Sequence, residues 1–388
     1  MDDKAYTIVN GRVLTPAGWL AGASLVIRAG RIAAICPDGG VAEGTERVDA
    51  EGLCVAPGCI DLHVHGGGGA DFLEATPEAF RTVAEAHAQY GTTALYATLA
   101  VFSPDTFRRA VRACKQVRRH PGNGAAVLGL HLEGNYLNPA MKGGQPPEYI
   151  SNPDPAEYEA MLVSAPCIRR WSAAPELPGA HDFACCVRSH GVLVALAHTT
   201  AGYAGVKAAY EAGFTHATHF YNAMTGVHRE GEYKCEGTVE GVYLTDGMTV
   251  EVIADGIHVP PALLRMVYKF KGVGRVALVT DSMAAGAMPE GGKPFDPRVI
   301  VEDGVCKLAD RSALAGSIAT ADRLIRTMVR EAGVPLEDAI RMASETPARI
   351  MGIADRKGTL EAGKDADVIL FDNDITIKAV FVEGRRVK

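Results

Sequence analysis

Apolar runs alternate with helical stretches through most of the chain, and no other feature restricts the possible folds as strongly. The runs "TTALYATLA" (92–100), "GVLVALAHTT" (191–200) and "MTVEVIADGIH" (248–258) precede the helical patterns "PDTFRRAVRACKQVRR" (104–119), "YAGVKAAYEAG" (203–213) and "PALLRMVYKF" (261–270). Repeated strand and helix units of this kind indicate a parallel sheet. About 300 residues follow the pattern without a glycine-rich dinucleotide turn, which favours a closed (β/α)8 barrel, TIM-like, over an open sheet.

Both ends of the chain have a different texture. The segments 5–18, 24–37 and 46–58 are short alternating strands with glycine turns, and they predict a small antiparallel sheet. The same texture returns only in 358–372 and 377–387. Because a lone hairpin is marginally stable, we expect the two ends to pair into one β-sandwich. The predicted domains are a sandwich of 1–56 plus 359–388 and a catalytic barrel of 57–358.

Composition excludes several classes of protein. A chain of 388 residues with 47% hydrophobic content can bury a large core. The net charge of -7 and the scattered basic residues argue against a nucleic-acid partner. No segment approaches the roughly 20 apolar residues of a membrane span. The nine cysteines form no CxxC pair, and the amino terminus lacks a signal core, so we expect a cytoplasmic protein with reduced thiols.

Polar residues occupy one recurrent place in the strand and helix units, the carboxyl end of the apolar run. They are His63, His65, Glu133, His198, His219, His258 and Asp281. In a barrel the carboxyl ends of all strands meet at one face. We therefore expect these residues to converge, although they are far apart in the sequence.

The stretch "IDLHVHGGGGADF" (60–72) is the clearest part of this set. Residues two apart on a strand point the same way, so His63 and His65 can present ring nitrogens to one ion. The four glycines then allow a close backbone turn. With Glu133, His198 and His219, the imidazole and carboxylate donors suit zinc, iron or manganese, as one or two ions.

Each of these residues also has a purely structural interpretation. A single histidine near a strand end is usually a hydrogen-bonded structural group, and Asp281 could cap the following segment. The joint placement favours the metal site. The other histidines are assigned structural roles where they lie in helical or connecting stretches, as do His87, His120, His181 and His190. His131 and His216 stay undecided, because strand alternation can point them away from the neighbouring ligands.

The sequence also resembles a known family. "PGCIDLHVHGGGG" is similar to the first-strand signature of the amidohydrolase superfamily. "LGLHLEG", "LAHTTAGY", "THFYNAMTGVHRE", "ADGIHVPP", "LVTDSMAAGAMPEG" and "LAGSIAT" resemble successive motifs of N-acetylglucosamine-6-phosphate deacetylases, from about residue 5 to 388. The resemblance implies a metal-bearing barrel with a β-sandwich, usually a homodimer. It also implies hydrolysis of N-acetylglucosamine 6-phosphate to glucosamine 6-phosphate and acetate, in amino-sugar catabolism.

The resemblance implies a role for each matching residue. Glu133, His198 and His219 would hold the main metal, and His63 with His65 a second one. Asp281 matches the catalytic aspartate and His258 a histidine that contacts the substrate and its oxyanion. The remaining substrate contacts would be Gly144, Gln145, Asn222, Ala223, Leu314, Ala315 and Gly316, with Arg229 binding the phosphate from the neighbouring subunit. His228 is either a further donor or a solvated loop residue.

Three positions depart from the family pattern. Asn135 replaces the proline expected after "HLEG", and Gln145 stands where some relatives carry a histidine. The "REPG" usual after the arginine becomes "REGEYKCEG", a longer loop that carries Glu232 and Lys234. We expect the metal site to tolerate these changes, whereas phosphate recognition is the part of the function that they affect most.

Other functions stay open at the level of the sequence. An N-acetylgalactosamine-6-phosphate deacetylase would need the same catalytic residues and differ only around the 4-hydroxyl of the sugar. A cyclic-amide hydrolase of the same superfamily would usually carry a modified lysine at a strand end, and none lies in the strand ends named above. A catalytically inactive interaction protein would have lost ligands or the aspartate, and all are present.

Overall fold

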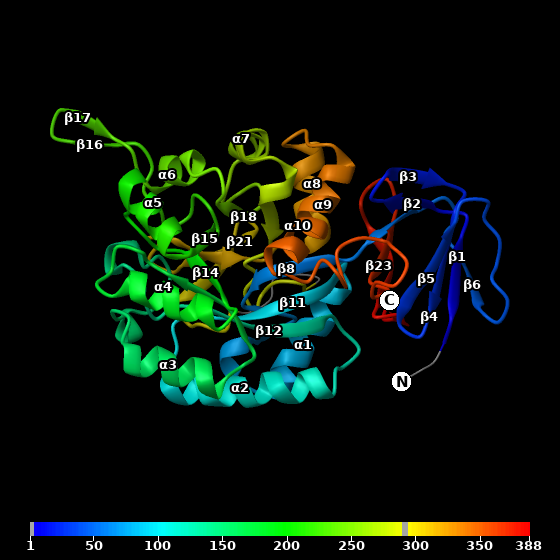
Figure 1. The fold of residues 1–388 in the computed structure, drawn as a ribbon, viewed down its shortest axis with the longest axis horizontal. Coiled ribbons are helices and arrows are strands. Elements are labelled where there is room, and N and C mark those ends of the chain that lie inside the picture. The colour runs from blue at the N-terminus through cyan, green and yellow to red at the C-terminus, as the bar shows by residue number, and fades with distance from the viewer. Residues whose placement is uncertain (1–3, 289–293) are drawn as a thin grey trace.

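The computed structural model describes residues 4–288 and 294–388 as two bodies side by side (Figure 1). The larger is a ring of strands surrounded by helices. The smaller contains both ends of the chain, coloured blue and red in Figure 1. Within the described residues, no helix is both long enough and apolar enough to cross a lipid bilayer.

The larger body is a barrel of eight parallel strands, which confirms the predicted fold class. Its closure brings together the first strand and the last. The Asp281 N–H donates to the His63 carbonyl at 2.8 Å, and the Thr280 hydroxyl donates to Asp61 Oδ2 at 2.6 Å. In ring order the strands are β8 (Cys59–Val64), β11 (Thr92–Leu99), β12 (Ala126–Glu133), β13 (Ile168–Ala173), β14 (Leu193–Leu196), β15 (Phe214–Ala217), β18 (Thr249–Ile253) and β19 (Val276–Val279).

Helices cover the outside of the barrel. The helix over 104–119 has the predicted bounds because Ser103 accepts the Thr106 N–H at 3.1 Å and Pro104 occupies the first turn, while Phe107 and Val111 lie on the buried face. The helices are α1 (Pro77–Ala88), α2 (Pro104–Arg119), α3 (Pro155–Ser164), α4 (Ala180–Ser189), α5 (Tyr203–Ala212), α6 (Thr238–Leu244), α7 (Pro261–Lys271), α8 (Ala321–Arg330), α9 (Leu336–Ala343) and α10 (Glu345–Ile350). Four 3-10 turns, Phe72–Glu74, Pro139–Met141, Pro147–Tyr149 and Val273–Arg275, connect other elements.

Two barrel strands, β13 and the short β15, have no counterpart among the apolar runs read from the sequence, and β13 is the more instructive. Its segment, "IRRWSA", carries two arginines, which interrupt the apolar pattern. Arg170 is nevertheless fully buried, because its guanidinium pairs with Glu251 of β18 inside the barrel. A charge with a buried partner is compatible with a core strand, and the partner is not visible from the local sequence.

The smaller body is a sandwich of two sheets that share a core including Ile8, Leu25, Val55, Val368 and Phe381. One sheet contains β5 (Arg31–Cys36), β4 (Ser24–Arg28), β1 (Tyr6–Val9) and β6 (Glu46–Asp49), and the other β25 (Arg385–Arg386), β24 (Ile377–Val382), β23 (Val368–Phe371), β7 (Cys54–Pro57), β2 (Arg12–Thr15) and β3 (Gly18–Ala21). The expectation of a purely antiparallel sheet was wrong, since β1 pairs with β6, and β2 with β7, in parallel. The boundaries of the two domains, 1–56 plus 359–388 and 57–358, remain a prediction from the sequence.

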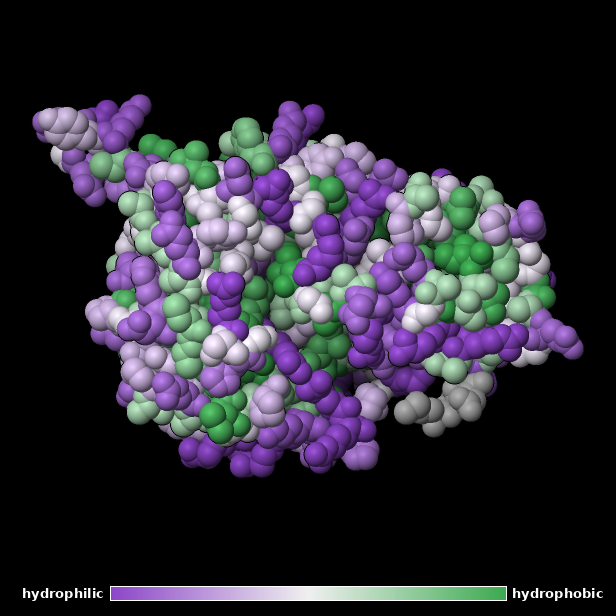
Figure 2. All heavy atoms as spheres, viewed as in Figure 1, coloured by the Kyte–Doolittle hydropathy of each residue, from purple (hydrophilic) through white to green (hydrophobic). Residues whose placement is uncertain are grey.

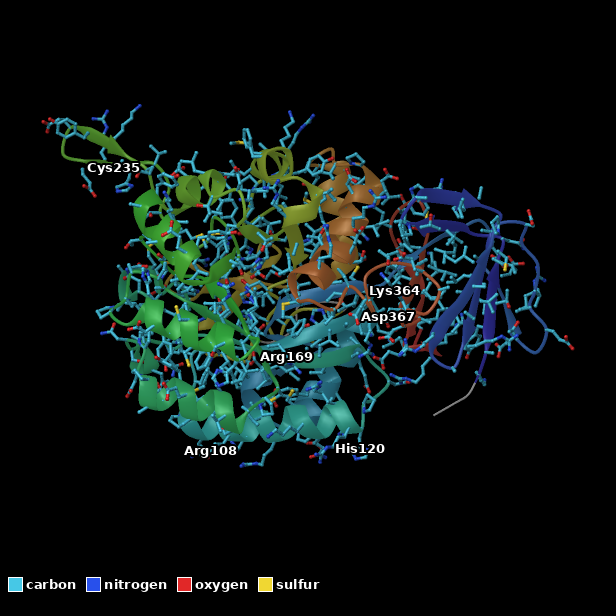
Figure 3. The ribbon with its side chains drawn as sticks, in the orientation of Figure 1. Arg108, His120, Arg169, Cys235, Lys364 and Asp367 are labelled. Atoms are coloured by element: carbon cyan, nitrogen blue, oxygen red, sulfur yellow. The ribbon has the colours of Figure 1, made fainter. Side chains whose placement is uncertain are left out.

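Two insertions extend from the barrel. A three-stranded antiparallel sheet, β20 (Val299–Glu302), β21 (Val305–Leu308) and β22 (Leu314–Ser317), follows β19. It corrects the expectation that alternating strands return only at the end of the chain. The hairpin of β16 (His228–Glu230) and β17 (Tyr233–Cys235) projects from the barrel as a largely hydrophilic arm, marked by Cys235 in Figure 3 (Figures 1, 2 and 3). A short pair, β9 (Gly66–Gly67) and β10 (Ala70–Asp71), lies after β8.

Candidate active site

A cavity of about 840 Å³ opens at the carboxyl ends of the barrel strands. Its lining combines strand ends with the insertion that carries β22. The predicted site residues in this lining are His65, Glu133, Gly144, Gln145, His198, His219, Asn222, Ala223, His258, Asp281, Leu314, Ala315 and Gly316. His63 lies beneath it and is fully buried. The structure therefore brings these residues around one space.

His63, on β8, and His65, just after it, both face Glu133, as expected for residues two apart on a strand. His63 Nε2 and His65 Nε2 are 3.1 Å apart. His65 Nε2 lies 3.2 Å from Glu133 Oε2 and 3.2 Å from Asp281 Oδ1. These ring nitrogens and the carboxylate could together hold a cation.

A second group uses the other oxygen of the same carboxylate. Glu133 Oε1 lies 2.9 Å from His219 Nε2 and 3.3 Å from His198 Nε2, and the two ring nitrogens are 3.1 Å apart. Glu133 thus belongs to both groups, and its Oε1 also lies 3.6 Å from His63 Nε2 of the first group. The arrangement has room for one or two ions that share this carboxylate.

The donor set fits a divalent metal. Ligands about 2.0–2.1 Å from a tetrahedral ion lie about 3.3 Å from one another, close to the separations found among these nitrogens and oxygens. Imidazole nitrogen and carboxylate oxygen are accepted by zinc, iron and manganese.

Charge within the cluster is balanced between acids and bases. Burial alone would lower the pKa of His65, but Asp281 and Glu133 raise it to about 9. Burial alone would raise the pKa of Glu133, but His63 and the hydrogen bonds from His198 and His219 hold it well below its usual range. A bound cation would supply the positive charge that protonated imidazoles otherwise provide.

Three residues of the site have a strained backbone conformation. His198, His219 and Asp281, each just after a barrel strand, have φ angles of 47°, 29° and 47°. Residues other than glycine rarely adopt this left-handed region, and each such residue costs about 1–3 kcal/mol. The turns aim three functional side chains at the cavity, so the strain is associated with the site.

The glycines after His65 allow the close turn that the sequence indicated. A Cβ atom on Gly67 would lie 2.6 Å from His87 Nε2, and one on Gly66 would lie 2.6 Å from the Ala284 nitrogen. His87 is buried 2.9 Å from the Gly66 carbonyl oxygen, so it has the structural role expected of it.

Glu251 is a member of the site that the sequence analysis missed. Its Oε1 lies 2.7 Å from His63 Nδ1 and accepts the His219 N–H at 3.1 Å. Because a carboxylate only accepts, it places the proton on Nδ1 of His63 and leaves Nε2 free to bind an ion. Arg170, paired with Glu251, also donates to the Leu62 carbonyl at 3.0 Å. The acidic residue in the run "MTVEVI" was the available signal.

His258 and Asp281 face the cavity with different supports. His258 Nδ1 lies 2.7 Å from Asp255 Oδ2, and its Nε2 is buried without a partner among the described residues. Burial alone would raise the pKa of Asp255, but the hydrogen bond and charge of His258 lower it. The backbone of Asp281 is fixed by strand β22, since the Asp281 carbonyl accepts the Ser317 N–H at 2.8 Å.

Two of the departures from the family pattern have clear contacts. Gln145 donates to Glu133 Oε2 at 2.9 Å and accepts the Val101 N–H at 3.1 Å, so it supports a ligand as well as lining the cavity. Asn135 accepts the Phe102 N–H and donates to the Phe102 carbonyl, both at 3.0 Å. This paired contact ties the loop after Glu133 to the loop after β11.

Arg229 is a predicted site residue that the structure does not bring to the cavity. It is exposed on the projecting hairpin, on strand β16, and does not line the cavity of its own chain. His228 beside it is exposed, as a solvated loop residue would be. Lys142 and Arg298, which the sequence analysis did not select, do line the cavity. Arg298 donates to the Gly144 carbonyl at 3.4 Å.

The undecided histidines lie inside the barrel, beneath the ligand groups and in neither of them, and the His131 ring packs against that of His63 with centroids 4.8 Å apart. His131 Nε2 lies 2.8 Å from Ser172 Oγ, and burial lowers the pKa of its ring well below the usual range. His216 Nδ1 lies 2.7 Å from Thr249 Oγ1. The remaining structural assignments, His120, His181 and His190, are exposed on the outer surface, as His120 shows at the end of α2 (Figure 3).

Comparison with known proteins agrees with this geometry. A model of the amidohydrolase family matches residues 54–387. The chain belongs to the amidohydrolase family. The N-acetylgalactosamine-6-phosphate deacetylase of Escherichia coli O157:H7 is 36% identical to this amidohydrolase over 377 residues, 96% of this chain and 97% of that protein. The N-acetylglucosamine-6-phosphate deacetylase of Vibrio furnissii is 36% identical over 334 residues, 85% of this chain and 82% of that protein.

Solved structures extend the agreement to the whole amidohydrolase chain. The N-acetylglucosamine-6-phosphate deacetylase of Pasteurella multocida has a TM-score of 0.92 and 30% identity, covering 98% of this chain and 99% of that chain. The Mycobacterium smegmatis enzyme of the same name has a TM-score of 0.89 and 33% identity, covering 99% and 100%. The predicted relationship to this deacetylase family is confirmed, and the chain is a hydrolase of amide bonds.

Proposed function

We propose that this amidohydrolase removes the acetyl group of N-acetylglucosamine 6-phosphate, yielding glucosamine 6-phosphate and acetate in amino-sugar catabolism. One observation carries the proposal: Asp281 lines the cavity with its Oδ1 3.2 Å from His65 Nε2, directly beside the potential metal groups but a member of neither. A free carboxylate next to a cation site is what amide hydrolysis needs.

Glu133, His198 and His219 would hold the main ion, and His63 and His65 a second one. Zinc, iron and manganese all accept these donors. When bound, the ion lowers the pKa of water and polarises the acetyl carbonyl, which offsets the poor reactivity of an amide.

Asp281 and His258 would carry the proton transfers and the charge stabilisation. Asp281 takes a proton from the attacking water and later delivers it to the departing amine, so one carboxylate acts as base and then as acid. The His258 ring lines the cavity, is fixed by Asp255 at Nδ1, and would contribute a hydrogen bond to the developing oxyanion. Leu314, Ala315 and Gly316 would pack against the sugar.

The phosphate would be bound by Arg229 of a second copy, in a homodimer. The hairpin holds Arg229 away from its own cavity, which suits a contribution to a partner. Large apolar side chains are exposed on the hairpin and on neighbouring helices, namely Val227 at 62%, Tyr233 at 70%, Leu244 at 61% and Phe270 at 67%. Such residues are suited to the apolar centre of an interface. Asn222 and Ala223 would contact the sugar phosphate from within the chain.

The galactosamine epimer is a second candidate substrate. The relative that is 36% identical over 96% of this chain bears the name N-acetylgalactosamine-6-phosphate deacetylase. The two reactions use the same catalytic groups and differ at the sugar 4-hydroxyl.

Nine cysteines are free in the structure, which supports a cytoplasmic location.

The test is release of free amine by the metal-loaded protein from N-acetylglucosamine 6-phosphate, the galactosamine epimer and unphosphorylated N-acetylglucosamine. We expect the phosphorylated glucosamine to have the highest kcat/KM, and Asp281→Asn to reduce kcat at least a hundredfold while metal content is unchanged. A higher kcat/KM for the epimer would favour the second candidate. No amine release from any of the three would overturn the proposal.

A second set of variants locates the phosphate. Arg229→Ala should raise KM for the phosphorylated sugar and leave that for the unphosphorylated sugar unchanged. Arg298→Ala with Lys142→Ala is the comparison, since these cations line the same cavity within one chain. If only this double variant affects the phosphorylated sugar, the phosphate is bound within the chain and Arg229 has no part in it.

A further inference from the structure

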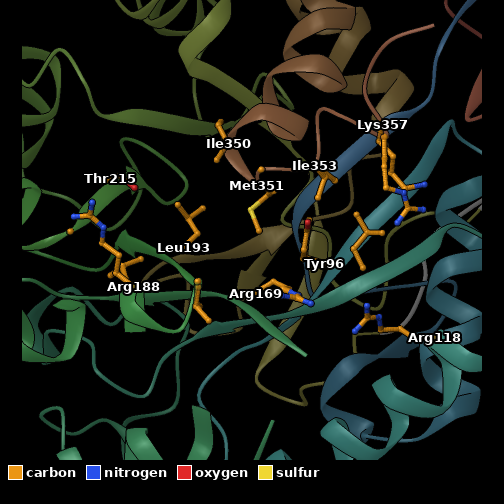
Figure 4. Close-up of a pocket in the computed structure, with 17 residues that line it drawn as sticks. Tyr96, Arg118, Arg169, Arg188, Leu193, Thr215, Ile350, Met351, Ile353 and Lys357 are labelled. Atoms are coloured by element: carbon orange, nitrogen blue, oxygen red, sulfur yellow. The ribbon is translucent and has the colours of Figure 1, made fainter. Parts of the chain in front are cut away.

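A second cavity, of about 670 Å³, lies at the amino-terminal ends of the barrel strands, at the opposite end of the barrel from the candidate active site (Figure 4). Its walls are the first residues of β14, the early parts of β12 and β13, and the segment 350–357 after α10. Its size is within the range of small-molecule sites, about 300–1,000 Å³. The proposed deacetylation makes no use of it.

The lining of this cavity is strongly basic in an acidic protein. It contains five cationic side chains, Arg118, Arg169, Arg188, Arg356 and Lys357, and no carboxylate among the described lining residues. The whole chain, in contrast, has a net charge of -7. Local charge of one sign in a concave site attracts ligands of the opposite sign.

Two of the cations are neutralised within the protein and three are not. Arg356 lies 2.8 Å from Asp365, and Lys357 2.8 Å from Asp367. Arg118, Arg169 and Arg188 form no ion pair and no side-chain hydrogen bond with any described residue. Their charges are therefore free to bind an anion.

Arg169 and Arg118 lie where a single ligand could meet both. Figure 4 shows their guanidinium groups turned toward the same part of the cavity, below Tyr96. Arg169 crosses strand β12 at Gly129, where an added Cβ would lie 2.5 Å from Arg169 Cγ. A glycine at this position therefore leaves room for the arginine. Two like charges turned toward one space are stabilised when an anion lies between them.

Tyr96 adds a neutral donor to the same place. Its side chain is 2% exposed, and its hydroxyl has no hydrogen-bond partner among the described residues. Burial raises the pKa of the phenol, although the charges of Arg169 and Arg118 act in the other direction, so the O–H is retained. The hydroxyl is reached from the cavity and is not sealed in the core, so it can donate a hydrogen bond to a polar ligand there.

We propose that this cavity binds a phosphate-bearing small molecule. The phosphate lies between Arg118 and Arg169, and one of its oxygens accepts a hydrogen bond from the Tyr96 hydroxyl. Planar guanidinium groups are suited to phosphate oxygens. The apolar side chains of Met351 and Ile353 line the same cavity and contact a less polar part of the ligand. Since the segment 350–357 leads toward the sandwich, the ligand joins this segment to the barrel.

Calorimetric titration with ADP, pyrophosphate and adenosine tests the proposal, in phosphate-free buffer. We expect ADP and pyrophosphate to bind, with an affinity that falls as sodium chloride is added, and adenosine alone not to bind. Arg118→Ala with Arg169→Ala should weaken ADP binding at least tenfold. The matched control is Arg119→Ala, an exposed arginine of α2 outside the cavity lining, which should bind ADP like the unmodified protein.

Further variants separate this cavity from the active site, which is also proposed to hold a phosphate. ADP binding should persist in Arg229→Ala and in the double variant of Lys142 and Arg298. If those variants abolish binding and the Arg118 and Arg169 variant does not, the phosphate is bound at the active site and the proposal is wrong. Absence of binding by both ADP and pyrophosphate would also overturn it. Arg118→Ala alone, at an exposed helix position, serves if the double variant does not fold.

Discussion

At the scale of single residues, the site depends on side chains that never reach the cavity. Glu251 fixes the proton of His63 at Nδ1, and Arg170 balances the charge of Glu251 inside the barrel. Partners of this kind orient metal ligands, and mutating one typically lowers metal affinity about 10–100-fold. The strained turns at His198, His219 and Asp281 serve the same end through the backbone.

Replacing Glu251 should therefore weaken metal binding. We expect Glu251→Gln to lower zinc affinity about tenfold or more, because a neutral amide oxygen is a weaker acceptor than the carboxylate and holds the His63 proton at Nδ1 less strongly. It also leaves Arg170 as an unpaired buried charge, at a cost of about 3–5 kcal/mol in the free energy of unfolding. Zinc affinity is measured by competition with a coloured chelator, and unfolding with urea.

The control for this variant removes both charges. Arg170→Met with Glu251→Gln should regain much of the lost stability and keep the weakened zinc affinity, because the charged partner of His63 is still missing. If zinc affinity returns together with stability, Glu251 acts only through the fold and not on the ligand.

At the scale of elements, the insertion β20–β22 supplies one wall of the cavity. Gly316, on β22, has a φ angle of 81°. A Cβ there would lie 2.7 Å from Met283 and 3.0 Å from the Asp281 carbonyl oxygen. The element thus approaches the strained turn of Asp281 through a glycine, and the Ser317 N–H completes the contact.

Adding one methyl group to this element should disturb catalysis. We expect Gly316→Ala to lower kcat about tenfold, by displacing Asp281, and to lower the free energy of unfolding by about 1–2 kcal/mol through its left-handed backbone. The matched control is Gly363→Ala, since Gly363 has a φ angle of 90° with no atom close to the added Cβ. Equal losses of kcat in both variants would contradict the proposed contact with Asp281.

At the scale of the whole molecule, the potential metal ligands join distant parts of the barrel. His63 belongs to β8, Glu133 to β12, and His198 and His219 follow β14 and β15. An ion that binds the folded chain alone stabilises it by about 2.7 kcal/mol when present at 100 times its Kd.

Removing the metal should accordingly lower Tm. We expect treatment with a chelator to reduce Tm by several degrees, and added zinc to restore it. His219→Ala, which removes one ligand of the main group, should show a smaller difference between the chelated and zinc-loaded forms. An unchanged Tm after elemental analysis has shown the ion to be gone would mean that the cluster does not tie the barrel together.

The amino-acid sequence by itself determined the barrel, the sandwich of both chain ends and the candidate ligands. Hydrophobic periodicity and strand-end position are local properties, and the barrel topology turns them into convergence at one face. The tertiary structure alone decided the rest. Strand β13 could not be identified from the sequence, because the buried charge of Arg170 is tolerated only through its pairing with Glu251, 81 positions away. The inward positions of His131 and His216, the sheet β20–β22 and the basic cavity around Arg169 likewise depend on contacts between segments far apart in the chain.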